Sequence, residues 1–387
     1  MAISPLSRVI PVSEPLLGSA EAENLSRALA EKALSGFFGT FIGSFEREFA
    51  AYCGANYGVA VNNGTSALHL ALATLGIKSG DEVLVASLTN MATFFAVLYQ
   101  GAIPIPVDIE ADTLALDPHL LTAKITAKTK AIIVVHLFGH PVAMDAVMAI
   151  AGRHGLYVIE DAAQAHGAEY HGKKVGSIGD IGCFSFYANK IIATGEGGML
   201  LTNNQDFAQR AASLKSLAFG GTNKFMHEAV GFNYRMPNIQ AAIGCAQLTR
   251  IEEIIDKKRA LAARYHQGLT ELADLELPVE KPGVRNVYWM YHLVLKNRLA
   301  SQRPALLQML RQQGIETREG FIPYTLQEHL PGRNVCAQHP CPVAESMAYA
   351  SFYLPSSPNL SPEEISYIID CLRHNLAALS ATAGKAL

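Results

Sequence analysis

The sequence predicts an α/β fold: a large domain with a mainly parallel sheet between helices, followed by a smaller C-terminal α+β domain. Short apolar runs bounded by glycine and aspartate alternate with helical segments over most of the chain, and this alternation requires a parallel sheet covered on both faces. From about Leu272 the alternation stops. With 387 residues, 50% of them hydrophobic, the chain is long enough for two domains. We place the large domain at residues 20–255 and the small domain at 256–387, on which residues 1–19 could pack.

Each element follows from its own pattern. Helical spacing covers 21–34 and 45–52, on either side of a glycine-rich loop at 35–43. The strands expected in the large domain are 59–61, 81–87, 102–107, 131–137, 156–159 and 181–187. The helices expected there are 67–75, 90–100, 142–154, 206–217 and one that begins after Pro237 and extends to about Arg264. The small domain should hold a strand at 287–295, a helix at 303–313 and a last helix that opens on the capping box Ser361-Pro362-Glu363-Glu364.

Composition argues against several functions. The net charge of −3 disfavours nucleic acid as a partner. The N-terminus lacks the pattern of a signal peptide, and the longest apolar region, 83–107, is broken by polar residues and prolines, so we expect no membrane span. Cys336 and Cys341 lie close together with His339 between them, but a metal site would need a fourth ligand. We expect no metal, reduced cysteines and a cytoplasmic protein.

Two charged residues near the middle of the chain are candidates for chemistry. Asp161 follows the strand expected at 156–159, and Lys190 follows the one at 181–187. Functional groups of such sheets gather at the carboxyl ends of the strands. Pyridoxal 5'-phosphate (PLP) needs a lysine that holds it as a Schiff base and an anion that keeps its pyridine nitrogen protonated. The pair therefore points to PLP, and the alternative is two solvated surface charges.

A polar turn, Asn62-Asn63-Gly64-Thr65-Ser66, joins an expected strand to an expected helix. Free backbone N–H groups and the helix dipole point to this turn, and small hydroxyls add donors, so it can bind a phosphate. It lacks the GxxxxGK[ST] of an ATP-binding loop and the GxGxxG of a dinucleotide site. The alternative is an ordinary helix N-cap.

Several motifs, in order over about residues 10–375, resemble the PLP-dependent nucleotide-sugar aminotransferases of the DegT/DnrJ/StrS group, within the fold-type I aminotransferases. They are NNGTSALHLAL, GDEVLVAS, VVHLFG, VIEDAAQAHGA, GDIGCFSFYANK, TGEGGML and GFNYRM followed by QAAIGCAQL. Each motif alone is weak, but the whole set in this order makes chance agreement negligible. The resemblance covers nearly the whole chain.

The resemblance implies a role for each matching position. Lys190 would hold PLP and later move the proton, Asp161 would pair with the pyridine nitrogen, and Gln164 would lie near the phenolic oxygen. The residues that would hold or adjoin the phosphate are Gly64, Thr65, Ser66 and Ser185. Asn233 would reach the phosphate of the partner subunit's cofactor, so the site would be shared across a homodimer. His166 would be structural.

One position departs from the family pattern. Many members carry an aromatic residue that stacks on the cofactor ring, in a T-[YFW]-x-A-[ST] frame. Here the frame is Thr89-Asn90-Met91-Ala92-Thr93, and Asn90 cannot stack as a ring does. Substrate contacts would come from variable loops, which we expect at 35–43, 220–230 and 317–329.

The implied activity is ping-pong transfer of an amino group from an amino acid, with L-glutamate as the expected donor, to a keto group of a nucleotide-linked deoxy sugar. The chain looks most like members that aminate a 4-keto-6-deoxy sugar for cell-surface polysaccharide. Three alternatives stay open. One is an aminotransferase for a non-nucleotide keto sugar, such as an octulosonate or a cyclitol. The second is a sugar dehydratase that depends on PLP or on pyridoxamine phosphate, a branch in which histidine replaces the lysine. The third is a non-enzymatic regulator that has kept the fold.

Overall fold

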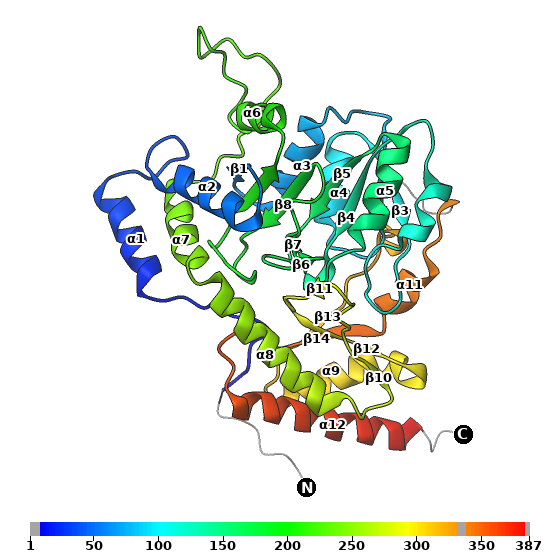
Figure 1. Cartoon of the computed structure of the whole chain (residues 1–387). Helices are drawn as coiled ribbons and strands as arrows, with labels where there is room; N and C mark the ends of the chain where they lie inside the picture. The colour runs from blue at the N-terminus through cyan, green and yellow to red at the C-terminus, as the bar shows by residue number, and fades with distance from the viewer. Residues whose placement is uncertain (1–7, 331–337, 384–387) are drawn as a thin grey trace.

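The computed structural model describes residues 8–330 and 338–383; Cys336 lies outside these residues. Figure 1 shows a large sheet with helices on both of its faces and, below it, a smaller sheet beside long helices. This arrangement confirms the predicted α/β class.

The large sheet has seven strands in the order β1-β9-β8-β5-β4-β2-β3. They are β1 (Tyr57–Val61), β2 (Glu82–Ala86), β3 (Ile103–Val107), β4 (Thr129–Val135), β5 (Tyr157–Asp161), β8 (Ile181–Ser185) and β9 (Gly198–Thr202). β9 is antiparallel to both of its neighbours, β1 and β8, and the other pairings are parallel. The prediction of a mainly parallel sheet is confirmed. β9 is the one strand of this sheet that the sequence-based prediction lacks.

Both faces of the large sheet are buried, because successive side chains of its apolar strands point to opposite faces. Leu84 and Ile132 belong to the core on one face, and Val83 and Ile133 to the core on the other. Six helices of the described chain contribute to the first core: α1 (Ser19–Ala30), α2 (Phe41–Cys53), α5 (Met144–His154), α7 (Asn238–Leu248), α8 (Ile251–Leu269) and α11 (Pro342–Ala348). Three contribute to the second: α3 (Gly64–Thr74), α4 (Ala92–Tyr99) and α6 (Gln205–Leu214).

The C-terminal part has its own sheet and core. Its strands, in the order β10-β12-β14-β13, are β10 (Leu275–Glu276), β12 (Tyr291–Leu295), β14 (Ser351–Leu354) and β13 (Arg318–Glu319). The helices of this part are α8 (Ile251–Leu269), α9 (Arg303–Gln312), α11 (Pro342–Ala348) and α12 (Pro362–Ala383). Ile10 pairs with Ile315 and is buried in this core, so the segment near the N-terminus packs here. The predicted boundary at 255/256 falls inside α8, which extends from the large sheet to the small one (Figure 1).

Short elements complete the described chain. A three-stranded sheet joins β11 (Val284–Arg285), β6 (Glu169–Tyr170) and β7 (Lys173–Lys174). The 3-10 turns are η1 (Pro118–Leu120), η2 (Thr122–Lys124), η3 (Leu137–Gly139), η4 (Asn297–Gln302) and η5 (Tyr324–Leu326). The predicted capping box is confirmed, because the Ser361 N–H donates to Glu364 Oε2 at 2.9 Å and the Glu364 N–H donates to Ser361 Oγ at 3.2 Å.

Some predicted boundaries are wrong for reasons visible in the backbone. Tyr288 has a φ of 47°, which a strand cannot accommodate, so the strand expected at 287–295 begins at Tyr291. Lys32 has a φ of 54°, and α1 accordingly ends before it. The single helix expected to reach Arg264 is two helices, because the chain breaks at Arg250 between α7 and α8.

Glu160 fixes the loop that leads from β5 to β8. Its side chain is fully buried (0% exposed) and accepts a hydrogen bond from His136 Nε2 at 3.0 Å. It also accepts three backbone N–H bonds of 2.7 Å, from Gly176, Ile178 and Gly179. Burial alone would raise the pKa of Glu160, but these donors hold it below its ordinary value. Because the folded-state pKa is lowered, this stabilisation is present at neutral pH and is lost as the pH falls through the carboxyl range.

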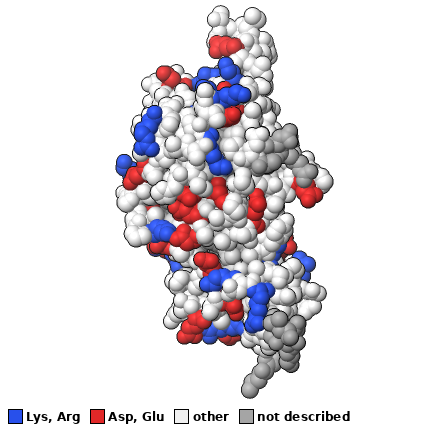
Figure 2. All heavy atoms as spheres, turned by 90° about the vertical axis from the view of Figure 1, so that its right-hand side faces the viewer, with Lys and Arg blue, Asp and Glu red and all other residues white. Residues whose placement is uncertain are grey.

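Charges are mixed on the surface. Figure 2 shows lysine and arginine interspersed with aspartate and glutamate on the face that it presents, in keeping with the net charge of −3. Among the described residues, no helix is long and apolar enough to cross a membrane.

We predict that Glu160→Gln destabilises the fold by about 3 kcal/mol, because the amide nitrogen would face backbone donors and the buried carboxylate network would be broken. Urea unfolding followed by circular dichroism measures the change. Glu23→Gln, at an exposed position of α1, is the matched control and should stay within about 0.5 kcal/mol of wild type. Equal stability of the two variants would contradict the role assigned to Glu160.

Candidate active site

A cavity of about 360 Å³ opens where β5 and β8 end and α3 begins. Several of the residues predicted as site residues line it: Gly64, Thr65, Asn90, Asp161, Gln164, Ser185 and Lys190. Ser66 and Asn233 are not among the described residues that line it. The sheet therefore brings together side chains that are far apart in the sequence, at the edge where parallel sheets commonly bind ligands.

The first turn of α3 forms one wall. Asn63 is the N-cap, and its Oδ1 accepts from the Ser66 N–H at 2.8 Å. The Ser66 side chain is buried instead of facing the cavity. A Cβ built on Gly64 would lie 2.7 Å from Ser185 Cβ, so only glycine lets the turn approach Ser185 this closely. The N–H groups of a first helical turn lack partners within the helix, and with the Ser185 hydroxyl they make a cup for a phosphate.

Asp161 lies at the end of β5, on the opposite side of the strand from Glu160. The Thr93 hydroxyl donates to its Oδ2 at 2.8 Å, and the Ala163 N–H donates to its Oδ1 at 3.2 Å. The Thr89 hydroxyl lies 3.2 Å from that of Thr93 and extends the chain of hydroxyls. Burial raises the pKa of Asp161 above its ordinary value, although these donors and the charge of Lys190 oppose the shift. A cationic group next to Asp161 would favour its ionised form.

Lys190 follows β8 by five residues, and its backbone N–H donates to Tyr187 O at 2.9 Å. Burial lowers the pKa of the Lys190 ammonium to about 8, and the charge of Asp161 opposes the shift. The amine lies 4.1 Å from the centre of the Trp289 ring. A lysine with a pKa near 8 is partly neutral at physiological pH, which nucleophilic and acid–base roles require.

Gln164 and His166 follow Asp161 in the chain but differ in their surroundings. Gln164 lines the cavity, and its Oε1 accepts from the Phe138 N–H at 2.7 Å. His166 is fully buried against the rings of Phe49, Phe184 and Phe186. Burial lowers the pKa of His166 to about 3, so this ring is neutral at physiological pH.

Asn90 lines the cavity but is engaged in the local backbone. Its Oδ1 accepts from the Ala92 N–H at 3.0 Å, at the start of α4. The side chain is exposed. It therefore stabilises the turn that leads into α4 and offers no ring face to the cavity.

Asn233 lies in an exposed part of the same protomer, where it pairs with Ser216. The segment between α6 and α7 that precedes it projects from the body (Figure 1). Residues 221–230 are all exposed, and Phe225 and Val230 are 75% and 88% exposed. The geometry leaves Asn233 free to contact a second molecule.

Sequence reasoning missed several residues of the site. Thr93 could have been found, because the spacing of Thr89 and Thr93 places both hydroxyls on one side of a helix start. Tyr187 and Glu196 line the cavity, but neither is distinguished by a spacing rule. Trp289 comes from the C-terminal part, and only the tertiary structure places it beside Lys190.

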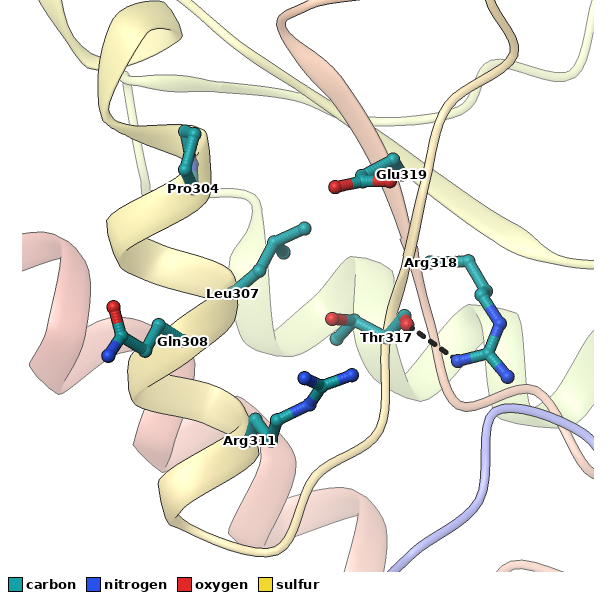
Figure 3. Close-up of a pocket in the computed structure, with 7 residues that line it drawn as sticks. All are labelled: Pro304, Leu307, Gln308, Arg311, Thr317, Arg318 and Glu319. Atoms are coloured by element: carbon teal, nitrogen blue, oxygen red, sulfur yellow. Dashed lines mark hydrogen bonds between the residues drawn. The ribbon is translucent and has the colours of Figure 1, made fainter.

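A second cavity, of about 460 Å³, lies between α9 and β13 in the C-terminal part. Figure 3 shows that Arg311 reaches from α9 toward the strand segment, whereas the Arg318 side chain turns away from the helix. Arg318 also lines a third cavity of about 320 Å³, together with Tyr187 and Asn189 from the Lys190 loop. Because Tyr187 lines both this third cavity and the main cavity, Arg318 lies close to the main cavity.

The residues present fit PLP. The glycine cup at Gly64 suits its phosphate, the buried acid Asp161 suits its pyridine nitrogen, and Lys190 is the amine that can hold it. The fold and the site thus define a PLP-dependent enzyme of fold type I.

Comparison with known proteins identifies the family. Residues 15–373 match the DegT/DnrJ/EryC1/StrS aminotransferase family. The GDP-perosamine synthase of Caulobacter vibrioides is 42% identical over 94% of this chain and 97% of that protein. The solved structure of S. venezuelae DesV superposes with a TM-score of 0.84 at 36% identity, over 92% of this chain and 94% of that one. A putative sugar aminotransferase from Streptococcus pneumoniae, solved in its PLP form, gives a TM-score of 0.88 at 26% identity, over 95% and 98% of the two chains.

The chain therefore belongs to the DegT/DnrJ/EryC1/StrS aminotransferase family. It is an aminotransferase, and its cofactor is PLP. The family resemblance, the fold type and the cofactor predicted from the sequence are confirmed.

We predict that Gly64→Ala weakens PLP binding by about tenfold to a hundredfold, because its methyl group would overlap Ser185 and force the cup open. A titration with PLP, followed by visible absorption, measures the dissociation constant. Gly152→Ala is the matched control, since a Cβ at that helical position meets nothing within 4 Å. An unchanged affinity in Gly64→Ala would show that the cup does not bind the phosphate.

Proposed function

We propose that the protein transfers the amino group of L-glutamate to a keto group of a nucleotide-linked deoxy sugar, such as GDP-4-keto-6-deoxymannose. The observation that carries the proposal is the meeting of Lys190 and Asp161 in one cavity, with a phosphate cup beside them. The substrate class is supported by relatives: GDP-perosamine synthases are 36–42% identical to this chain, and a dTDP-amino-sugar transaminase is 38% identical.

Each site residue then has a role. Bound PLP supplies an electron sink and carries the amino group between the two substrates. Asp161 supplies a carboxylate at the end of β5, and hydrogen bonds from Thr93 and Ala163 fix the orientation of this carboxylate. Gly64, Thr65 and Ser185 hold the phosphate. Lys190 Nζ anchors the cofactor and, once released, gives and takes the proton at its own nitrogen, which its lowered pKa favours.

Arg318 is a candidate for the acceptor side. A nucleotide-linked sugar carries a diphosphate, which the planar guanidinium of an arginine binds well. Arg318 belongs to the predicted loop at 317–329 and lines the cavity that also contains Tyr187 and Asn189. We therefore propose that the nucleotide end of the acceptor extends from the main cavity toward Arg318.

Three other functions are less well supported. In the dehydratase branch a histidine replaces the lysine, whereas this chain has Lys190. A regulator that had lost the chemistry would have no need of a lysine whose ammonium is destabilised by burial. A non-nucleotide keto sugar is less well supported because several relatives are named for GDP- or dTDP-linked sugars.

We predict that the purified protein loaded with PLP shows the visible band of a lysine-bound cofactor, and that L-glutamate bleaches it. Lys190→Ala should lack this band and lose turnover by about 10²- to 10⁴-fold, because the anchoring and proton-moving amine is gone. Lys173→Ala, at an exposed lysine, is the control and should behave as wild type. Full turnover by Lys190→Ala would refute the proposed role.

The bleached enzyme also tests the acceptor. A GDP-linked 4-keto-6-deoxy sugar should restore the visible band, and an octulosonate or a keto cyclitol should not. Recovery with the free sugars alone would favour the non-nucleotide alternative.

We further propose a homodimer whose active sites are shared. Asn233 lies outside the cavity of its own protomer and follows an exposed apolar segment. Burying Phe225 and Val230 against a second copy would be favourable, and it would place Asn233 at the partner's phosphate. We also propose a cytoplasmic location, since the cysteines among the described residues are free thiols.

A mixture of two impaired variants tests the shared site. Lys190→Ala and Asn233→Ala would each be defective alone, but a mixed dimer would hold one site with both native residues. After the dimers exchange subunits, about a quarter of all sites should regain activity. If Asn233 served the site of its own protomer, mixing would restore nothing.

A further inference from the structure

Trp289 is the one tryptophan of the chain, and it lies beside the amine of Lys190. We propose that Trp289 is a positioning residue for Lys190: its indole face is the resting place of the free amine, and Lys258 holds the indole there. The proposal rests on the proposed function in one respect, namely that Lys190 is the residue that anchors the cofactor. The contact itself is independent of the reaction.

The indole is fixed from several directions. Its Nε1–H donates to Asn189 O at 2.7 Å, so it is tied to the residue that precedes Lys190. Its backbone N–H donates to Phe138 O at 2.8 Å, and its ring lies 6.2 Å from that of Phe138 with nearly parallel planes. Phe138 in turn binds Gln164. The indole is therefore connected both to the loop that carries Lys190 and to the wall of the cavity.

Lys258 holds the backbone of Trp289. Its Nζ donates to Trp289 O at 2.9 Å and to Ser356 O at 2.7 Å. The side chain is only 2% exposed, and burial lowers the pKa of its ammonium to about 7. Burying a lysine costs free energy, which its two hydrogen bonds to carbonyl groups partly offset. Here Lys258 joins α8 and the end of β14 to the segment before β12.

The backbone next to the indole is in a strained conformation. Tyr288 has a φ of 47°, which is unfavourable for a bulky side chain. This left-handed residue turns the chain between Val287 and Trp289. The Val287 N–H donates to Gly139 O, and the Trp289 N–H donates to Phe138 O. A strained residue of this kind persists only where surrounding contacts hold its conformation. The hydrogen bonds of Trp289 hold the chain next to Tyr288.

The consequence for Lys190 is both geometric and electrostatic. An ammonium group at 4.1 Å from the ring centre is attracted by the face of the indole, which is the strongest of the aromatic rings in this interaction. The contact favours the protonated amine, whereas burial disfavours it. Other titratable groups face this region from the packed elements: Asp161 on β5, His166 after it, Lys258 on α8, His292 on β12 and Tyr353 on β14.

Because the chain has one tryptophan, its indole emission reports on Trp289 alone. In full-length protein freed of PLP, the emission should change with pH around the titration of Lys190, and the change should be absent in Lys190→Met. A change due to Lys258 would occur in both proteins, so the difference between the two curves isolates Lys190. Identical curves would show that the amine does not rest on the indole.

A second measurement addresses positioning. The rate at which trinitrobenzenesulfonate labels Lys190, followed by peptide mass spectrometry across pH, gives the pKa of its amine. Trp289→Phe, with a weaker ring face and no N–H for Asn189, should lower this pKa by about half a unit and raise the labelling rate at pH 7 about threefold. Phe321→Leu is the control, because it removes a ring packed on Phe138 at 5.6 Å and should leave the pKa unchanged.

The anchor is tested in the same way. Lys258→Met should shift the indole emission to longer wavelength, because the segment that carries Trp289 loosens, and should move the Lys190 midpoint in the same direction as Trp289→Phe. A folded Trp289→Phe protein with the wild-type labelling profile would overturn the proposal, and a wild-type profile in Lys258→Met would remove Lys258 from it. Neither measurement depends on turnover, so failure here is distinct from failure of the proposed aminotransferase reaction.

Discussion

The parallel pairing of β5 with β8 is the constraint on which the rest of the site depends. Its register places Asp161 opposite Cys183, about 4.8 Å away across the sheet, and β8 ends two residues later at Ser185. Glu160 secures this pairing, since it binds the backbone of the loop that leads into β8. The adjacent carboxylates of Glu160 and Asp161 thus have different roles. Because neighbouring side chains of a strand point to opposite faces, one fixes the fold and the other faces the cavity.

The cavity holds an acid and a lysine that are both disfavoured as ions by burial. Burial raises the pKa of Asp161 and lowers that of Lys190, and each charge partly offsets the shift of the other. A site of this kind is costly for the fold and suited to a ligand that carries charges of both signs. The cup at Gly64 favours an anion and the position beside Asp161 favours a cation, which matches the phosphate and the pyridine nitrogen of PLP.

The sequence was sufficient for features that depend on local patterns. The apolar runs, Asp161, Lys190 and the turn at Gly64 could be predicted because strand ends and helix starts have short-range signatures. Features that depend on long-range packing could not. β9 follows a glycine-rich turn and gives no sign that it is antiparallel. The left-handed Tyr288 shortens a strand that its apolar sequence favours, and Ser66 is buried outside the cavity lining.

The proposed dimer concerns the surroundings of both Asn90 and Asn233. The Asn90 side chain accepts from the Ala92 N–H just before α4 and gives the cavity no ring from that position. The segment that carries Asn233 lies beside the phosphate cup, because the Asn62 N–H donates to Tyr234 O at 2.9 Å. The exposed segment 221–230 precedes this pairing in the chain. In the proposed dimer, a second copy packed on this segment would bury Phe225 and Val230, which are otherwise in contact with water. If the proposed dimer forms, residues of the partner protomer would be available to line the cavity that has no ring at Asn90.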